Sequence, residues 1–407
     1  MKYYFILGRN PTLSSAELTA VLGERVTFNH LSSEVLVADV QGELSPREIM
    51  PRFGGVVKFG EILEMSDEFS AEDIAEILKN SLAKKIYFGF SFYKLEEGVS
   101  DTHFKKENQK IKNLAMEIKN LLKDAKIQAR WVTSKEANLS SVVIKKNKLL
   151  TEVGAELIFL IGTEKIYLGK TLAVQEFEDL SFRDYGRPRR SMRVGLMPPK
   201  LAKIMLNLAR ADKYDTLMDP FCGFATILEE AMLWGYKNLI GSDINTETLA
   251  GAKENLEWLV KNYQLPTTNY QLTECDARRL SQKFSPHSID AIITEPYLGP
   301  PLRGKETPEK IQKIIKELSS LYLAAFREFK KIIKPSGRVV ILFPVFHTEK
   351  QNFFLPILDE IKKIGFNVAD PLPKDFKKYN FIKITPRNSI LYFRPDQLVW
   401  REIFIFS

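Results

Sequence analysis

The sequence contains few cysteine and histidine residues. Only two cysteines, Cys222 and Cys275, and four histidines occur among its 407 residues. A disulfide framework needs more cysteines than this, and a structural zinc site needs a cluster of cysteine or histidine ligands. We therefore expect neither disulfides nor a bound metal. A catalytic thiol at Cys222 is also not favoured, because a small residue in a tight turn explains that position.

The sequence also lacks a long apolar run. No stretch approaches the roughly 18 consecutive apolar residues of a membrane span, and the N-terminus lacks the ordered regions of a signal peptide. Hydrophobic residues still make up 44% of the chain, which suffices for buried cores. The length predicts two or three domains. We expect a cytoplasmic protein that does not contact a membrane.

Positive charge is concentrated in two segments. The net charge is +8; residues 51–100 hold 6 basic and 9 acidic side chains, whereas 101–150 hold 12 basic and 5 acidic. Lys105 and Lys106 lie in the basic segment, for which a solvated helix face is an equally good explanation. The second cluster contains an aromatic residue and consists of Arg183, Tyr185, Arg187, Arg189, Arg190 and Arg193. Arginines beside an aromatic ring suit a nucleic-acid phosphate backbone.

Strand and helix patterns alternate along the chain and predict an α/β protein. Apolar spacing predicts helices over 68–82 and 105–124. From residue 214 onward the regular alternation indicates a mostly parallel sheet with helices on both faces, and residues 390–406 read as an antiparallel hairpin at its edge. The predicted organisation is two small α/β units, a charged connector and a larger C-terminal domain, with boundaries at 1–60, 61–175, 176–195 and 196–407.

The strongest functional signal is the segment LMDPFCGFATILEEA, residues 217–231. An apolar run ends at Asp219, a loop with the small residues Gly223 and Ala225 follows, and a helix begins near Thr226. In such a strand-to-helix turn the backbone N–H groups point at a ligand, and small residues let the ligand approach the main chain. The segment therefore predicts a binding loop.

Two acidic residues follow the next predicted strands. Asp243 lies twenty positions after Gly223 and suits hydrogen bonds from ribose hydroxyls, and Asp276 suits the exocyclic amine of an adenine ring. Each acid alone also fits a helix N-cap. Their order and spacing favour a cofactor site, because ligands of open parallel sheets bind at the carboxyl ends of the strands.

A fourth strand, residues 289–293, ends in Thr294, Glu295, Pro296 and Tyr297. The nitrogen lone pair of an exocyclic amine is delocalised, so an enzyme that methylates it must hold the amine and accept its hydrogen bonds. Thr294 or Glu295 can accept such a bond, Pro296 can fix a backbone carbonyl towards the amine, and Tyr297 can stack on an extruded base. A core aromatic at a strand end explains Tyr297 equally well.

These motifs resemble those of the THUMP-containing RNA methyltransferases, in particular the tRNA guanine-N2 methyltransferase family that acts on the guanosine at tRNA position ten. The resemblance covers almost the whole chain. The opening YYFILGRNPTLSSAEL is similar to the ferredoxin-like start of that family, residues 61–175 to a THUMP domain, and RDYGRPRRSMRVGLMPPKLAKIMLNLA to the segment that joins THUMP to the catalytic domain.

The resemblance implies a fold, a cofactor and a substrate. The fold is a ferredoxin-like unit plus a THUMP module, followed by a Rossmann-like class I methyltransferase domain with a seven-stranded sheet. The cofactor is S-adenosylmethionine and the partner is tRNA, with no metal; the sequence leaves open whether a small activating subunit takes part.

The site residues follow motif by motif. DPFCGFAT is similar to the family's D-P-F-C-G-[ST]-G-T loop, and TEPY to its D-P-P-Y signature. The implied cofactor residues are Asp219, Phe221, Cys222, Gly223, Ala225, Thr226, Asp243, Ile244, Asp276 and Ala277. The implied catalytic residues are Thr294, Glu295, Pro296 and Tyr297. The charge clusters and the loop after the signature add the expected RNA contacts Lys105, Lys106, Arg183, Tyr185, Arg187, Arg189, Arg190 and Arg303.

The chain departs from the family pattern at two places. Phe224 and Ala225 replace a Ser or Thr and a Gly, and the carboxylate of the signature is shifted from position 294 to Glu295. Because successive strand residues face opposite ways, Glu295 reaches the amine only if the chain has begun to turn. The leading hypothesis is a tRNA guanine-N2 methyltransferase. A DNA or other-RNA amino-methyltransferase and an RNA-binding protein with a degenerate site stay open.

Overall fold

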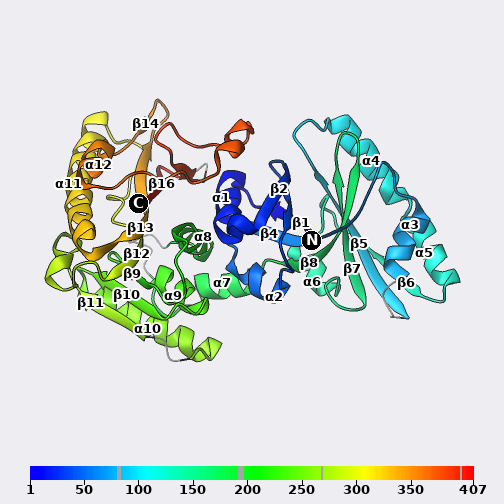
Figure 1. Cartoon of the computed structure of the whole chain (residues 1–407), viewed down its shortest axis with the longest axis horizontal. Coiled ribbons are helices and arrows are strands. Elements are labelled where there is room, and N and C mark those ends of the chain that lie inside the picture. The colour runs from blue at the N-terminus through cyan, green and yellow to red at the C-terminus, as the bar shows by residue number, and fades with distance from the viewer. Residues whose placement is uncertain (80–83, 191–196, 267–268, 395–396) are drawn as a thin grey trace. The chain divides into compact units, whose positions relative to one another are not determined.

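The computed structural model describes residues 1–79, 84–190, 197–266, 269–394 and 397–407. The chain forms two compact units (Figure 1): the first consists of residues 1–15 and 22–179, the second of residues 16–21 and 180–407. Each unit is built on its own eight-stranded sheet. Among the described residues, no helix has the length and apolar character needed to cross a membrane.

The first unit has the strand order β2-β3-β1-β4-β8-β7-β5-β6. Its central strand β4 pairs antiparallel with β1 on one side and with β8 on the other, so residues 1–60 and 61–175 share one sheet and the expected boundary at residue 60 lies within β4. The strands are β1 (Lys2–Leu7), β2 (Val26–Leu31), β3 (Val35–Val40), β4 (Val56–Ser66), β5 (Lys85–Lys94), β6 (Gln128–Val132), β7 (Gly154–Ile161) and β8 (Ile166–Val174).

Three amphipathic helices pack their apolar side chains on one face of this sheet, namely α3 (Ala71–Lys79), α4 (Asp101–Asn113) and α5 (Ala115–Asp124). The single helix predicted over 105–124 is two helices, because the chain tightens at Leu114, whose N–H bonds to Ile111 O at 3.1 Å. Residues 80–82 of the predicted first helix lie outside the described residues. Shorter helices are α2 (Pro46–Ile49) and α6 (Ser141–Lys146); α1 (Pro11–Leu22) spans both units.

A buried ion pair lies at the centre of the first sheet. Lys58 of β4 and Glu156 of β7 are fully buried, with Nζ 2.6 Å from Oε1. Hydroxyl groups satisfy the rest of the carboxylate: Ser91 donates to Oε1 and Thr171 to Oε2, each at 2.6 Å. Because every charged atom has partners from neighbouring strands, a lysine is tolerated in the core.

The second unit contains the predicted mostly parallel sheet, in the order β11-β10-β9-β12-β13-β16-β15, with β14 beside β13. The first five strands pair parallel, and β13, β16 and β15 pair antiparallel, which confirms the antiparallel edge hairpin. The strands are β9 (Thr216–Asp219), β10 (Asn238–Asp243), β11 (Asn269–Glu274), β12 (Ile289–Thr294), β13 (Ile333–His347), β14 (Asn352–Phe353), β15 (Ile390–Tyr392) and β16 (Val399–Phe406).

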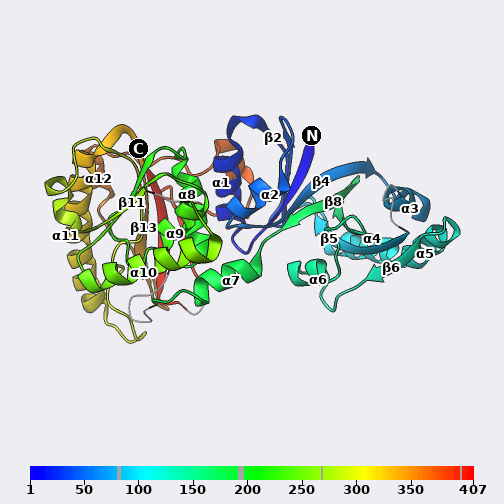
Figure 2. The same ribbon diagram turned by 90° about the horizontal axis from the view of Figure 1, so that it is seen from below.

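Helices cover both faces of this sheet, as the alternating pattern predicts. Figures 1 and 2 show α11 (Pro308–Ile332) and α12 (Leu358–Ile364) on one face and α8 (Pro199–Ala209), α9 (Thr226–Leu233) and α10 (Thr246–Tyr263) on the other. The expected connector over 176–195 contains a helix, α7 (Phe177–Tyr185), and its residues 191–195 lie outside the described residues. Both faces are covered, so functional groups must emerge at the strand ends.

Candidate active site

The predicted acidic residues meet at one edge of the second sheet. β9, β10, β11 and β12 are parallel neighbours, and their carboxyl ends carry Asp219, Asp243, Asp276 and Thr294. Backbone hydrogen bonds extend the ladder past the strands: Cys222 N donates to Ser242 O at 2.9 Å and Cys275 N to Asp243 O at 3.0 Å. The loops that follow these strands are therefore held side by side.

The loop after β9 uses two left-handed residues to turn into α9. Gly223 has φ +51°, and its N–H donates to Asp243 Oδ2 at 3.1 Å. Ala225, at the N-cap of α9, has φ +71°, a conformation that costs an alanine about 1 to 2 kcal/mol and a glycine little. The glycine-to-alanine departure thus keeps the loop's shape at a cost in strain.

The structure accommodates the other departure, Phe224, by packing it on α10. A Cβ at Gly251 would lie only 2.7 Å from the Phe224 ring, so the glycine makes room for the phenylalanine. The buried Asn255 amide donates to Phe224 O and to Arg189 O, each at 3.0 Å. The binding loop is therefore tied to α10 and to the chain segment between α7 and α8.

Asp219 is buried beneath this loop. Its Oδ1 accepts hydrogen bonds from the Thr294 hydroxyl at 2.6 Å and from Phe221 N at 3.1 Å. Burial raises the pKa of Asp219 to about 7, although the Thr294 hydrogen bond works in the opposite direction. Burial also raises the pKa of the Cys222 thiol, which disfavours a thiolate nucleophile at that position.

Thr226, the first residue of α9, does not direct its side chain to the loop. Its hydroxyl accepts a hydrogen bond from Arg187 Nη1 at 2.7 Å. Any contribution of Thr226 to an anionic or polar ligand would come from its backbone at the helix N-terminus.

The neighbouring strand ends carry two carboxylates and an exposed apolar side chain. Asp243 accepts backbone N–H groups with both carboxylate oxygens, and the next residue, Ile244, is an apolar side chain with 64% exposure. Asp276 caps the turn that begins with the buried Ala277, and it forms an ion pair with Arg278 at 2.6 Å. Hydrogen bonds from Arg278 lower the pKa of Asp276, so this carboxylate is an acceptor at neutral pH.

At the end of β12 the side chains of Thr294 and Glu295 face different partners. Thr294 is fully buried and bonds to Asp219. Glu295, one residue past the strand, accepts a hydrogen bond from Arg401 Nε of β16, at 2.5 Å between Nε and Oε1. No described residue bonds to its second oxygen. Of the two candidate acceptors, the structure therefore commits Thr294 to Asp219 and leaves an oxygen free on Glu295.

Tyr297 is not the core aromatic that its strand-end position allows. Its side chain has 57% exposure, while its carbonyl accepts a hydrogen bond from the buried Tyr322 hydroxyl at 3.2 Å. Pro296, between Glu295 and Tyr297, is buried. The backbone here is anchored and the tyrosine ring is presented to solvent, an arrangement suited to stacking.

Two of the expected RNA contacts are buried. Arg183 forms a bidentate ion pair with Glu230 at 2.6 and 3.3 Å, and Arg187 pairs with Glu229 at 3.0 Å and donates to the Arg183 carbonyl. Both arginines are 3% exposed or less. Neither guanidinium is available to a phosphate; their ion pairs instead hold α7 and the residues that follow it against α9.

The remaining expected contacts lie on the surface. The Arg190 guanidinium lies 4.9 Å from the centre of the Tyr185 ring, which is 65% exposed, and Arg189 pairs with Glu254 at 2.7 Å. Exposed side chains also occur at Lys105 and Lys106 on α4 and at Arg303 after the signature. Arg193 lies outside the described residues.

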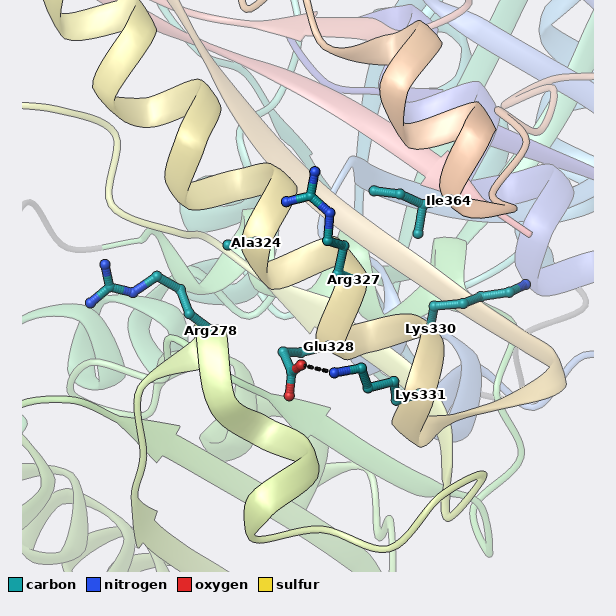
Figure 3. A pocket seen from close by; sticks show the side chains of 7 residues that line it. All are labelled: Arg278, Ala324, Arg327, Glu328, Lys330, Lys331 and Ile364. Carbon is teal, nitrogen blue, oxygen red and sulfur yellow. Dashed lines mark hydrogen bonds and ion pairs between the residues drawn. The ribbon is translucent and has the colours of Figure 1, made fainter.

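A basic hollow of about 510 Å³ lies elsewhere on the second unit, beside α11 (Figure 3). None of the strand-end residues lines it; it is lined by Arg278, Ala324, Arg327, Glu328, Lys330, Lys331 and Ile364. Glu328 and Lys331, neighbours on α11, form an ion pair at 2.5 Å on one side of it. One of the residues that line it, Arg278, also forms the ion pair with Asp276 of the predicted site. Within the described ranges, no group of acidic, histidine and cysteine residues has a metal-binding arrangement.

Sequence analysis did not single out Arg401, the partner of Glu295. The two residues lie 106 positions apart, so no local motif joins them. The available signal was the pair of charged residues, Arg401 and Glu402, inside the otherwise apolar strand β16. Charged residues that interrupt a buried strand require partners.

Comparison with known proteins matches the catalytic unit to methyltransferases. A family model for the RMKL-like methyltransferase domain matches residues 187–353. A tRNA (guanine(10)-N2)-dimethyltransferase from Methanocaldococcus jannaschii is 33% identical over 42% of this chain and 45% of its own length, so the chain spans about half of that relative. A probable tRNA (guanine(10)-N2)-dimethyltransferase from Methanothermococcus thermolithotrophicus is 34% identical over 28% of this chain and 68% of its own length.

The fold has a counterpart among solved structures. The crystal structure of TrmN from Thermus thermophilus superposes with a TM-score of 0.50 and 15% identity, over 100% of this chain and 99% of that one. The match covers about two thirds of the length of the Methanothermococcus thermolithotrophicus relative. The acidic residues at the strand ends and the left-handed binding loop are consistent with that match. The chain belongs to the tRNA (guanine(10)-N2)-dimethyltransferase family.

Proposed function

We propose that this protein transfers methyl groups from S-adenosylmethionine to the exocyclic N2 amine of a guanosine in tRNA, of the position-ten type. The observation that carries the proposal is the 2.6 Å hydrogen bond between Thr294 and Asp219. It fastens the signature to the cofactor loop, so that Glu295 and Tyr297 follow directly at the same sheet edge. The site for the methyl donor and the site for the methyl acceptor are thereby adjacent, as group transfer requires.

The residues at the strand ends fit the cofactor. A Cβ at Gly223 would meet no described atom within 4 Å, which leaves the loop's backbone approachable. Asp243 would accept ribose hydroxyls, Ile244 would pack on the adenine ring and Asp276 would accept its exocyclic amine. The bound cofactor supplies an electrophilic methyl group on a sulfonium.

Glu295 is the group we assign to the target amine. Arg401 holds one carboxylate oxygen at 2.5 Å and leaves the other to accept an N–H of the amine. That hydrogen bond orients the nitrogen lone pair, and the carboxylate can take the proton that the nitrogen loses when it gains a methyl group. Tyr297, anchored through its carbonyl and exposed through its ring, would stack on the extruded guanine.

Side chains of each unit would contact the RNA. We assign residues 61–175 as a THUMP domain, with residues 1–60 as its ferredoxin-like neighbour, and residues 196–407 as the catalytic domain. Lys105 and Lys106, with the exposed Tyr185–Arg190 pair and Arg303, supply positive charge and a stacking face for RNA. A tRNA substrate also supports a cytoplasmic location.

The test is transfer of labelled methyl groups to unmodified tRNA, followed by nucleoside analysis. We expect N2-methylguanosine, and the time course will distinguish one transfer from two. Glu295→Gln removes the negative charge but keeps the size, so turnover should fall about 100-fold or more while cofactor affinity is retained. Glu360→Gln, an exposed glutamate on α12, is the matched control.

Each result has a distinct meaning. Full activity of Glu295→Gln would refute the role of the shifted carboxylate but not the activity. Cofactor binding without transfer to any RNA would favour the binding-only alternative. Transfer to DNA but not to tRNA would assign the other class of amino-methyltransferase.

A further inference from the structure

Three aromatic rings form a parallel stack on the second unit. Trp400 lies between His347 and Phe393, with ring centres 4.2 Å and 4.1 Å apart and interplanar angles of 16° and 18°. His347 ends β13, Trp400 lies in β16 and Phe393 follows β15. Phe393, the outer ring, has 47% exposure. A ring whose purpose was to fill the core would be covered.

The stack adjoins the catalytic signature. β13 runs parallel to β12, with Thr294 opposite Ile341, and it continues beyond the end of β12 to His347 on the carboxyl side of the sheet. The loop after Tyr297 packs against this region: a Cβ at Gly299 would lie 3.4 Å from the Phe346 ring, and one at Gly304 would lie 3.6 Å from Leu398. Arg401, which holds Glu295, is the residue after Trp400.

Hydrogen bonds fix the inner rings of the stack. Trp400 Nε1 donates to Gln397 O at 2.9 Å, and His347 Nδ1 lies 2.7 Å from Asn352 Oδ1. Each of the two rings is thus held in place by a hydrogen bond to one of its nitrogen atoms. Phe393 rests on a preorganised surface, which reduces the entropy that would be lost when a further ring is added.

The surroundings of the stack are basic. Arg394 follows Phe393, and Arg303 and Lys305 lie in the loop that packs on Leu398; all three are exposed, and none has an ion pair within the described part of the chain. The acidic residue of that loop, Glu306, accepts the backbone N–H groups of Arg303 and Gly304 and lies 3.7 Å from Lys310. Aromatic faces together with unpaired cations are the chemistry that binds single-stranded nucleic acid.

We propose that the His347–Trp400–Phe393 stack is a nucleobase-binding platform, on which Phe393 receives an unpaired base of the RNA that flanks the target nucleotide. The platform deepens the proposed function and rests on it for the identity of the RNA. It would hold the strand on one side of the extruded base while Tyr297 stacks on the base itself. RNA recognition commonly uses such splayed, stacked bases.

The test compares RNA affinities of Phe393 variants in the full chain. Phe393→Ala should weaken binding of an unmodified tRNA transcript and of a short oligoadenylate by about 5-fold to 100-fold. Phe393→Trp should restore it, and binding to a blunt RNA duplex should change less than about twofold, because paired bases cannot stack there. Tyr214→Ala, which removes an exposed aromatic distant in sequence from the site, is the control.

Unchanged affinity of Phe393→Ala for all three RNAs would overturn the platform. An equal loss on the duplex would also overturn it, since the effect would not depend on an unpaired base. Cofactor affinity and the melting temperature must match the parent protein, which excludes misfolding. If the parent protein transfers no methyl group but Phe393→Ala still loses single-strand affinity, the platform stands and the proposed function fails; the reverse pattern rejects the platform alone.

Discussion

Replacing Thr294 with valine should destabilise the catalytic unit in a pH-dependent way. The Thr294 hydroxyl donates to the buried carboxylate of Asp219 at 2.6 Å, and valine keeps the shape but removes the donor. Burial raises the pKa of Asp219 from 3.8 to about 7, and the Thr294 hydrogen bond partly offsets this. The substitution therefore raises that pKa further, because it removes a group that stabilises the ionised form.

The direction of the pH dependence follows from the linkage between proton binding and folding. A carboxyl group whose pKa is raised by folding contributes stability that is fully present below the unfolded value of 3.8 and is lost as the pH rises through about 7. A hydrogen bond to a neutral group is worth about 0.5 to 1.5 kcal/mol and one to a charged group about 1.5 to 3 kcal/mol. We therefore expect Thr294→Val to lower the free energy of unfolding by about 1 kcal/mol at about pH 5.5 and about 2 kcal/mol at about pH 8.5.

Urea unfolding followed by tryptophan fluorescence measures this difference. In a Trp131→Phe background the remaining tryptophans all report on the second unit, namely Trp234, Trp258 and Trp400. Thr294→Ser keeps the donor and should behave more like the parent protein. Asp219→Asn removes the titration, so the Thr294→Val effect in that background should no longer depend on pH. If Thr294→Val cost the same free energy at both pH values while Asp219 is intact, the coupling of these two residues would be refuted.

Other consequences concern the core, the loop and the cofactor. Lys58→Met leaves Glu156 buried without its charge partner and should destabilise the first unit by about 3 to 5 kcal/mol. Amide hydrogen exchange should then become faster in the strands of the first sheet; faster exchange at the chain termini alone would contradict this. Ala225→Gly relieves about 1 to 2 kcal/mol of left-handed strain and loses about 0.8 kcal/mol of methyl burial, so urea unfolding should shift little, whereas Ala225→Val should be clearly destabilised. Arg278→Ala frees Asp276 and should tighten S-adenosylmethionine binding up to about fivefold by calorimetry; weaker binding would show that Arg278 itself holds the cofactor.

The architecture of the catalytic unit could be predicted because its strands and helices follow their apolar periods and its turns carry glycine and proline. The first unit was harder for a physical reason. β4 contains Lys58 and Gly60, which read as polar and flexible positions in isolation. Lys58 is tolerated because Glu156 lies on a strand almost one hundred residues later, and Gly60 is required because a Cβ there would lie 2.0 Å from Lys170 O. Neither fact is visible in a local window.

The sequence predicts which residues of the candidate site lie at the strand ends, but not the directions of their side chains. Strand-end spacing brought Asp219, Asp243 and Asp276 together at one edge, but the direction of each side chain depends on partners from other elements. Arg183 reads as a surface cation until Glu230 is placed beside it. Glu295 reads as a misplaced carboxylate until Arg401 of β16 is seen to hold it.

The most direct test of the central claim is methyl transfer to a tRNA transcript in which the guanosine at position ten is replaced by inosine, which lacks the N2 amine. We predict that the guanosine transcript accepts methyl groups and yields N2-methylated guanosine, while the inosine transcript binds with similar affinity and accepts none. Methyl transfer to the inosine transcript at an undiminished rate would contradict the account.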